Sequence, residues 1–200
     1  MNSNWTMNHI NHIWNQSKRT HLLYPPCNTE SLAQIDLNTT ARQPLIISIG
    51  QFRFAKSFIS QNKTNSRFGT ISFVTFFFFF EKRPEKNHSL QLEAFKQFVS
   101  QNRHLIDSIE RQQPEKVKLV LIGGSRNEED QARIKNLQRK AVEFKLEDRV
   151  EFKVNISRDE LIKYLSKATI GVHTMFNEHF GIGVVEFMVC EILFDYFFFL

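Results

Sequence analysis

The sequence predicts an α/β fold in which a parallel, Rossmann-like sheet carries helices on both faces. Three observations predict it. Short apolar runs recur along the chain, a stretch with helical spacing of apolar residues separates each run from the next, and most runs end in glycine or a polar residue. Strands that alternate with helices in this way form parallel sheets.

Composition narrows the classes of function. The chain has 200 residues, 42% hydrophobic content and a formal net charge of +5, which fits one soluble globular domain with part of another. Cys27 and Cys190 lie too far apart in sequence to indicate a disulfide framework or a metal cluster. No run of five like charges points to nucleic acid, and no 18-residue apolar run or signal peptide is present.

The first strand is expected after a polar, irregular segment. We interpret residues 1–44 as an inter-domain segment, because Tyr24-Pro25-Pro26 favours an extended or turned chain. Residues 45–50, Leu-Ile-Ile-Ser-Ile-Gly, then form a buried strand. Gln51-Phe52-Arg53 follows at its exit.

Residues 54–83 break the pattern, because they hold nine of the 21 phenylalanines, five of them in one run from Phe76 to Phe80. An exposed run of this kind is an aggregation hazard. One interpretation is a membrane-surface anchor, although the amphipathic pattern of such elements is absent. We favour a non-native insert, since phenylalanine codons form a pyrimidine tract and the segment resembles a retained intron. The tail from residue 189 to 200 invites the same account.

The remaining elements follow in order. Residues 88–106 have helical spacing at Leu92, Phe95, Val99 and Leu105, so one amphipathic helix is expected. A strand at 118–123 precedes a charged helix at 128–146, and a third strand covers 149–156. A capping box begins at Ser157 and leads into a helix that runs to residue 168. A fourth strand at 169–174 precedes the last helix, which is expected to begin at Gly181.

Candidate functional groups gather where the strands end. Right-handed crossovers place every strand exit at one edge of a parallel sheet, and ligands bind beyond that edge. After the fourth strand, Glu178 and Glu186 are separated by seven residues that include Phe180-Gly181-Ile182-Gly183. A helix that begins at this turn would favour a phosphate at its N-terminus. The alternative is an ordinary helix with two solvated glutamates.

Cations also follow the first strand. If the insert is removed, Arg53 (or Arg83) lies three residues before Lys86, and the two charges could hold a diphosphate. The alternative is solvated surface charge. Gly123-Gly124 would allow close approach of a ligand, or simply form a turn. We expect His173 to be a packed core histidine.

The pattern Glu-x-Phe-Gly-Ile-x-x-x-Glu at 178–186 resembles the motif of retaining GT-B glycosyltransferases of family 4. Together with residues 48–53, 84–95, 119–138 and 150–186, it is similar to the α-1,2-mannosyltransferases of N-glycan assembly. The resemblance covers residues 1–53 and 84–188. It implies the C-terminal, donor-binding half of a GT-B fold, incomplete here. Residues 45–53 and 84–188 would form that nucleotide-sugar-binding domain, and residues 189–200 an aberrant tail.

The resemblance implies that mannose is transferred from GDP-mannose to a dolichol-pyrophosphate-linked oligosaccharide. This would take place on the cytosolic face of the endoplasmic reticulum membrane, without metal, cofactor or nucleic acid. Glu178, Lys86 and Arg53 would act in catalysis, Glu178 facing the mannose and the cations holding the diphosphate.

The same resemblance assigns the donor-binding residues. Arg83 would share the diphosphate, Glu186 would bind the ribose hydroxyls, and Asn155 would border the guanine. Backbone contacts to sugar and phosphate would come from Phe180, Gly181 and Ile182.

The chain departs from the family, since the membrane anchor and the acceptor-binding domain are absent from these 200 residues. We therefore expect no transfer by the chain alone, with weak GDP binding. Two other classes stay open: a non-catalytic donor-domain fragment or gene-model artefact, and a family 4 transferase with a different donor.

Overall fold

The computed structural model describes residues 2–14, 17–36, 41–53, 86–175, 178 and 180–196. The insert that we predict at 54–83 lies outside these residues, and so does Arg83. Within the described ranges, no helix is both long enough and apolar enough to cross a membrane.

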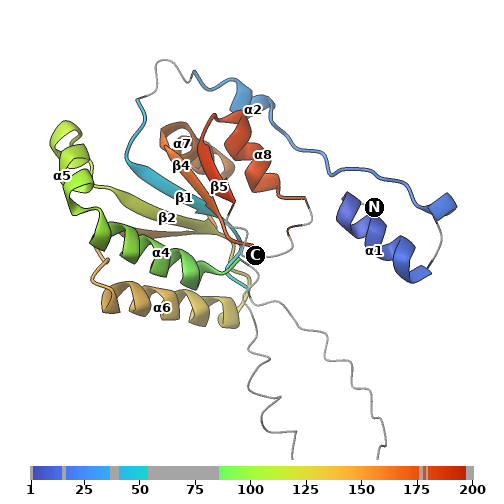
Figure 1. Cartoon of the computed structure of the whole chain (residues 1–200), viewed down its shortest axis with the longest axis horizontal. Coiled ribbons are helices and arrows are strands. Elements are labelled where there is room, and N and C mark those ends of the chain that lie inside the picture. The colour runs from blue at the N-terminus through green and yellow to red at the C-terminus, as the bar shows by residue number, and fades with distance from the viewer. Residues whose placement is uncertain are drawn as a thin grey trace, which may run out of the picture.

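Helices and strands alternate through most of the chain (Figure 1). The helices are α1 Asn4–Trp14, α2 Glu30–Ala33, α4 His88–Gln101, α5 Arg103–Gln112, α6 Glu128–Glu143, α7 Arg158–Lys167 and α8 Ile182–Val189, with a short 3-10 helix, η1, at Ser17–Arg19. The strands are β1 Leu45–Ile49, β2 Lys118–Gly123, β3 Val150–Val154, β4 Ile170–His173 and β5 Leu193–Tyr196.

The strands form one parallel sheet in the order β3-β2-β1-β4-β5. In the central register, Ile47 of β1 lies opposite Val120 of β2 and Gly171 of β4. All strands run the same way, so their carboxyl ends meet at one edge. This confirms the predicted fold class.

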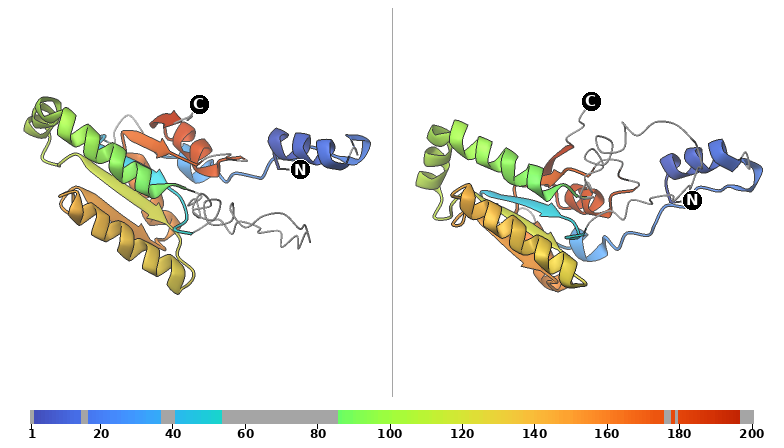
Figure 2. Two further views of the ribbon diagram at one scale, coloured as in Figure 1. Left: turned by 60° about the horizontal axis from the view of Figure 1, so that its bottom comes forward. Right: turned by 90° about the horizontal axis from the view of Figure 1, so that it is seen from below.

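Helices cover both faces of the sheet (Figure 2), and an apolar core lies on each face. Side chains of a strand alternate between faces, so Leu119 and Leu121 of β2 join the core under α4, α5 and α6. Val120 and Ile122 join the core under α2, α7 and α8. The strands that carry both cores are thereby held from both sides, which fixes the positions of their exits.

Two elements differ from the sequence prediction. The single helix expected at 88–106 is two helices, because Asn102 has φ −117° and ψ 35° and ends α4. Leu105, expected on the apolar face, is 52% exposed on α5. Beyond α8, residues 193–196 of the tail form β5, which pairs in parallel with β4.

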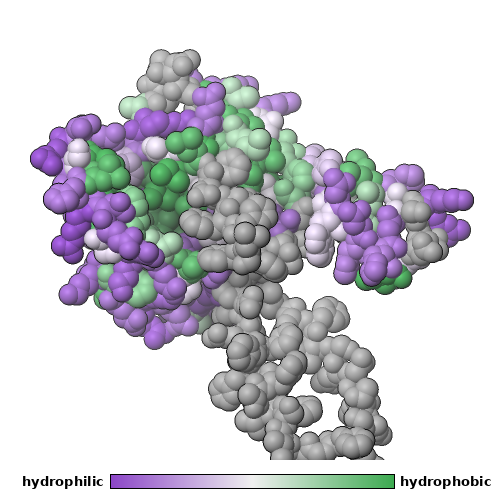
Figure 3. Space-filling view, viewed as in Figure 1, coloured by the Kyte–Doolittle hydropathy of each residue, from purple (hydrophilic) through white to green (hydrophobic). Residues whose placement is uncertain are grey.

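The first 44 residues are also less irregular than the sequence indicates. Residues 4–14 form α1, which has no buried residue and stands apart from the sheet in Figures 1 and 2. Trp5, Ile13 and Trp14 are 46%, 57% and 62% exposed. In the space-filling view, α1 shows apolar and polar residues side by side, whereas α4, α5 and α6 present mostly polar ones (Figure 3).

Candidate functional site

Backbone hydrogen bonds join the exits of β1 and β2 at the carboxyl edge of the sheet. The N–H of Gly50 donates to the carbonyl of Ile122 at 2.8 Å, and the N–H of Phe52 donates to Gly124 at 3.0 Å. A Cβ at Gly123 would lie 2.0 Å from the carbonyl oxygen of Gly50, so only glycine permits this approach. The two loops therefore leave the sheet as one unit.

Asn155 connects the end of β3 to the loop that follows β2. It adopts a left-handed conformation, with φ 54°, directly after the strand. Its side chain accepts a hydrogen bond from the N–H of Ser125 at 2.9 Å and donates to the Ser125 carbonyl at 3.0 Å. Asn155 thus lies at the predicted edge, where it fixes the loop that follows β2.

Three charged or titratable side chains meet above β1 and β4. Nζ of Lys86 lies 2.8 Å from Oε2 of Glu178, and Nε2 of His173 lies 3.0 Å from the same oxygen. The side chains are 19%, 13% and 5% exposed for Lys86, Glu178 and His173, respectively. Two predicted site residues, separated by 92 positions, are therefore in direct contact.

The close contact with Nε2 of His173, together with the hydrogen bond and charge of Lys86, holds the pKa of Glu178 well below its usual range. Burial acts in the opposite direction, and the two donors outweigh it. Glu178 is consequently an anion at neutral pH, held between two nitrogen donors.

The backbone that carries Lys86 is tied to the end of β4. Oγ1 of Thr174 donates to the Lys86 carbonyl at 2.7 Å, and Nε2 of Gln91 donates to Thr174 Oγ1 at 2.7 Å. Sδ of Met175 lies 2.9 Å from Nζ of Lys86. The loops after β1 and β4 are thus connected by side-chain hydrogen bonds as well as by the Lys86–Glu178 ion pair.

His88, the first residue of α4, adds no positive charge near Lys86. It is fully buried and stacks on Phe52 with a ring separation of 4.8 Å. Burial, helped by the nearby Arg133 cation, lowers the pKa of His88 to about 3. Lys86 is therefore the cation that this part of the loop offers at neutral pH, together with Arg53, which is half-buried at the β1 exit.

Helix α8 begins at Gly181 as predicted. Gly181 has φ 76°, which glycine adopts without strain. Gly183, in the first turn, lies over the end of β1, because a Cβ there would be 3.6 Å from Cβ of Ile49. The N-terminus of α8, with its unpaired N–H groups and positive dipole end, thus lies at the edge that carries Lys86 and Glu178.

Glu186 is buried, 7% exposed, and is not solvated as the alternative interpretation requires. Its carboxylate pairs with the guanidinium of Arg158 at the start of α7. The same guanidinium donates to the carbonyl of Asn28 at 3.4 Å. Near the other end of the motif, the Tyr24 and Phe180 rings lie 5.6 Å apart. Residues 24–28 therefore contact the motif directly at Phe180 and are connected to Glu186 through Arg158.

The structure brings Lys86, Glu178, Phe180 and Gly181 to one edge with Asn155 and Arg53, while Glu186 lies one helix turn further along α8. His173 is buried, as the sequence predicted, but sequence reasoning missed its contact with Glu178, and it missed Arg158. The position of His173 at the end of a strand could have indicated a site residue, because strand ends face the edge where ligands bind. Nothing in the sequence indicated the role of Arg158, since an arginine in the first turn of a helix is usually exposed. The individual roles that we assigned to these residues stay predictions.

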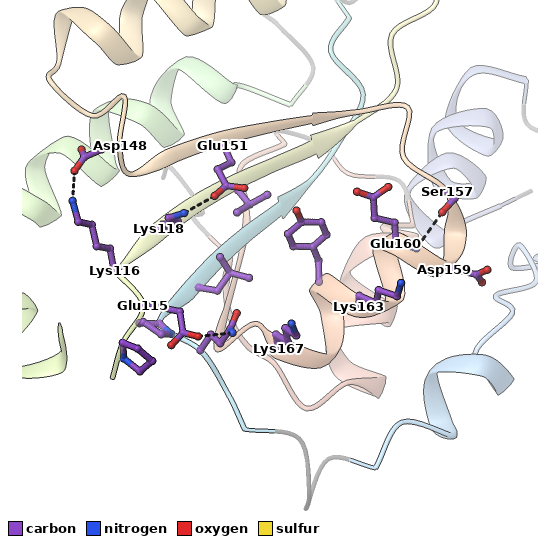
Figure 4. Close-up of a pocket in the computed structure, with 16 residues that line it drawn as sticks. Glu115, Lys116, Lys118, Asp148, Glu151, Ser157, Asp159, Glu160, Lys163 and Lys167 are labelled. Carbon is purple, nitrogen blue, oxygen red and sulfur yellow. Dashed lines mark hydrogen bonds and ion pairs between the residues drawn. The ribbon is translucent and has the colours of Figure 1, made fainter. Parts of the chain in front are cut away.

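A separate cavity of about 1130 Å³ lies between α7 and the sheet, and its lining extends from the amino ends of β1 and β2 to the start of α7 (Figure 4). Two of its four lysines pair with lining carboxylates, Lys116 with Asp148 at 2.7 Å and Lys118 with Glu151 at 2.6 Å. It includes none of the predicted site residues.

A protein-family model described as "Glycosyl transferases group 1" matches residues 74–194. The chain is 40% identical over 190 residues to the human GDP-Man:Man(3)GlcNAc(2)-PP-Dol alpha-1,2-mannosyltransferase, covering 94% of this chain and 31% of that protein. It is 36% identical over 199 residues to the protein of the same name from Dictyostelium discoideum, covering 96% and 32%. The chain thus spans about a third of the length of these curated relatives.

Solved structures with the same fold include Anabaena HepE in complex with UDP and glucose, with a TM-score of 0.60 and 15% identity. A glycosyltransferase from Rickettsia africae matches with a TM-score of 0.61 and 11% identity. Each comparison covers 96% of this chain and 42% of the other. These likenesses confirm the predicted partial GT-B architecture.

Proposed function

This chain belongs to the group 1 glycosyl transferases, and on that basis we propose that it is the donor-binding part of a mannosyltransferase. The donor is GDP-mannose, and the acceptor is a dolichol-pyrophosphate-linked oligosaccharide that receives the sugar in α-1,2 linkage. Support for this substrate pair comes from the names of the relatives and from their 36–40% identity to the chain.

The observation that carries the proposal is the contact between Lys86 and Glu178 beside the N-terminus of α8. A nucleotide-sugar needs positive charge for its diphosphate and a carboxylate for its sugar hydroxyls. Lys86 supplies the positive charge and Glu178 supplies the carboxylate. The two side chains are in contact at the carboxyl edge, where ligands of parallel sheets bind.

Chemically, departure of GDP from the mannose leaves negative charge on the diphosphate. The ammonium of Lys86 and the N–H groups at the start of α8 would stabilise that developing charge, with Arg53 as a second cation. Arg83 is proposed for the same diphosphate. No metal ion is needed in this scheme, because these groups supply the positive charge.

The remaining contacts orient the donor. Glu178 accepts hydrogen bonds from the mannose hydroxyls, and Phe180, Gly181 and Ile182 contribute backbone groups. The carboxylate of Glu186, held in place by Arg158, accepts hydrogen bonds from the ribose hydroxyls. Asn155 borders the guanine.

The acceptor and the membrane belong to the whole enzyme. We propose that the complete protein works on the cytosolic face of the endoplasmic reticulum membrane, where dolichol-linked acceptors would be available. The chain spans about a third of its relatives, so we expect these 200 residues to bind GDP without transferring mannose.

Titration calorimetry with GDP and UDP tests the donor site. We expect GDP to bind more tightly than UDP, and Lys86→Met to weaken GDP binding about tenfold to a hundredfold, because a charge-assisted hydrogen bond to phosphate is lost. Lys135→Met, which removes an exposed lysine of α6, serves as the matched control and should leave affinity unchanged.

Equal GDP affinities for the Lys86→Met and Lys135→Met variants would contradict the assigned site. Tighter binding of UDP than GDP would favour a family 4 transferase with a different donor. No binding of either nucleotide would favour the non-catalytic fragment.

A further inference from the structure

In the proposed reaction, the ammonium of Lys86 interacts with both Glu178 and the donor diphosphate, and it cannot bond fully to both at once. In the structure, its ammonium is bonded to Glu178 at 2.8 Å. A donor diphosphate carries more negative charge than one carboxylate and would draw the ammonium toward itself. Glu178 is only 13% exposed, and withdrawing the cation from a buried carboxylate is costly unless another donor remains.

His173 is placed to be that donor. Its Nε2 lies 3.0 Å from the same Oε2 that Lys86 contacts, and its side chain is 5% exposed. It is the last residue of β4, a strand paired with β1 on one side and β5 on the other. Lys86, by contrast, reaches Glu178 through a flexible four-carbon stem. One partner of the carboxylate is therefore mobile and the other is fixed to the sheet.

We propose that His173 is the positioning residue that keeps the Glu178 carboxylate in place when a donor diphosphate draws Lys86 away. This inference rests on the proposed function, since it needs a diphosphate at Lys86. It identifies a role that the family motif from Glu178 to Glu186 does not contain.

The chemistry requires a hydrogen-bond donor and not a charge. A neutral imidazole protonated at Nε2 can donate to the carboxylate as an imidazolium does, so the role of His173 does not require a charge. Without this donor, releasing Lys86 would leave Glu178 poorly compensated. Lys86 would then stay on Glu178, and the diphosphate would bind more weakly.

A double-mutant cycle on the full 200-residue chain, with GDP affinity from titration calorimetry as the readout, tests the proposal. In the chain with Glu178, we expect His173→Met to weaken GDP binding about tenfold, a coupling of the size found for contacting side chains. In the Glu178→Gln background, no carboxylate holds Lys86, so His173→Met should change the affinity less than twofold. A general packing defect would weaken binding equally in both backgrounds.

His173→Gln provides the rescue, because its amide N–H can donate from a similar position and should restore most of the affinity. His104→Met, at an exposed position of α5, is the matched control and should have no effect. Thermal unfolding confirms that each variant is folded. If methionine is not tolerated at position 173, His173→Asn replaces it, since its shorter amide cannot span the distance to Glu178.

The outcomes separate the two claims. Equal losses in both backgrounds, or a His173→Gln variant as weak as His173→Met, would overturn the role of His173 while leaving the donor site intact. If the unaltered chain binds no GDP, the proposed function fails, and the role of His173 fails with it.

Discussion

Gly123 is the residue at which the geometry of the edge is most constrained. The carbonyl of Gly50 approaches so closely that an added Cβ would lie 2.0 Å from its oxygen. The neighbouring Gly124 has room for a Cβ, which would make an ordinary contact at 3.7 Å with Oδ1 of Asn155. The close approach of the Gly50 carbonyl therefore requires glycine at position 123 and not at position 124. Alanine substitution at each position tests this difference.

We expect Gly123→Ala to lower the free energy of unfolding by about 3 kcal/mol, because a backbone carbonyl cannot move aside as a flexible side chain can. Gly124→Ala, the matched control, should cost less than about 1 kcal/mol. Urea unfolding followed by circular dichroism gives both values. Equal costs would show that the loops after β1 and β2 are not held as closely as the structure indicates.

Sequence reasoning at the residue scale predicted that the candidate residues gather at one edge of the sheet, and it missed the bonds between them. Glu178, Gly181 and Lys86 could be placed because a parallel sheet brings strand exits to one edge, whatever the side chains do. His173 was interpreted as a core residue, since burial follows from its strand while its contact with Glu178 depends on how the next loop folds back. The pairing of Arg158 with Glu186 likewise depends on the packing of α7 beside α8.

Arg42 acts at the scale of elements, because it joins the C-terminal ends of two helices. Its guanidinium donates to the carbonyls of Leu165, Ser166 and Ala168 at the end of α7. It also donates to the carbonyl of Cys190, the C-cap of α8. Helix ends leave carbonyls without partners, and a cation there is favourable.

Arg42→Ala should lower the free energy of unfolding by about 2–4 kcal/mol, because several carbonyls lose a charged donor. Arg42→Lys should recover only part of this, since one ammonium cannot cover both helix ends. Arg139→Ala, on the exposed face of α6, should stay within about 0.5 kcal/mol of the unaltered chain. An Arg42→Ala variant as stable as Arg139→Ala would mean that α7 and α8 are held by their apolar core alone.

The predictable elements are those with a strong local signal. The apolar runs gave four strands, and Ser157 caps α7 by accepting from the N–H of Glu160 at 3.2 Å, as expected. The break between α4 and α5 occurs at Asn102, and neither proline nor glycine marks it. β5 was missed because its residues were interpreted as part of an aberrant tail, and its pairing with β4 is a non-local contact.

At the scale of the molecule, the sheet is continuous across the segment that we interpret as an insert. β1 leads to Arg53 before this segment, and Lys86 follows it. A Cβ at Gly50 would lie 2.8 Å from Cγ of Lys86, so the chain returns to the end of β1 that it left. Both cores and every described strand are assembled from the residues on either side.

Deleting residues 54–83 tests this view of the molecule. The connection between Arg53 and Lys86 would shorten from 32 residues to two. Each halving of a loop recovers about 0.6 kcal/mol of closure entropy, so four halvings give about 2 kcal/mol of added stability. The deletion also removes the phenylalanine run, which should reduce aggregation on refolding.

Urea unfolding of the deleted and full chains, with light scattering after refolding, measures both effects. The Lys86–Glu178 contact should survive, since the residues that position it lie outside the deleted segment. The deletion removes Arg83 and brings Arg53 to its place three residues before Lys86, so calorimetry should find GDP bound about as tightly as by the full chain. A deleted chain that is less stable, or that loses GDP binding, would show that residues 54–83 belong to the domain and that the interpretation as an insert is wrong.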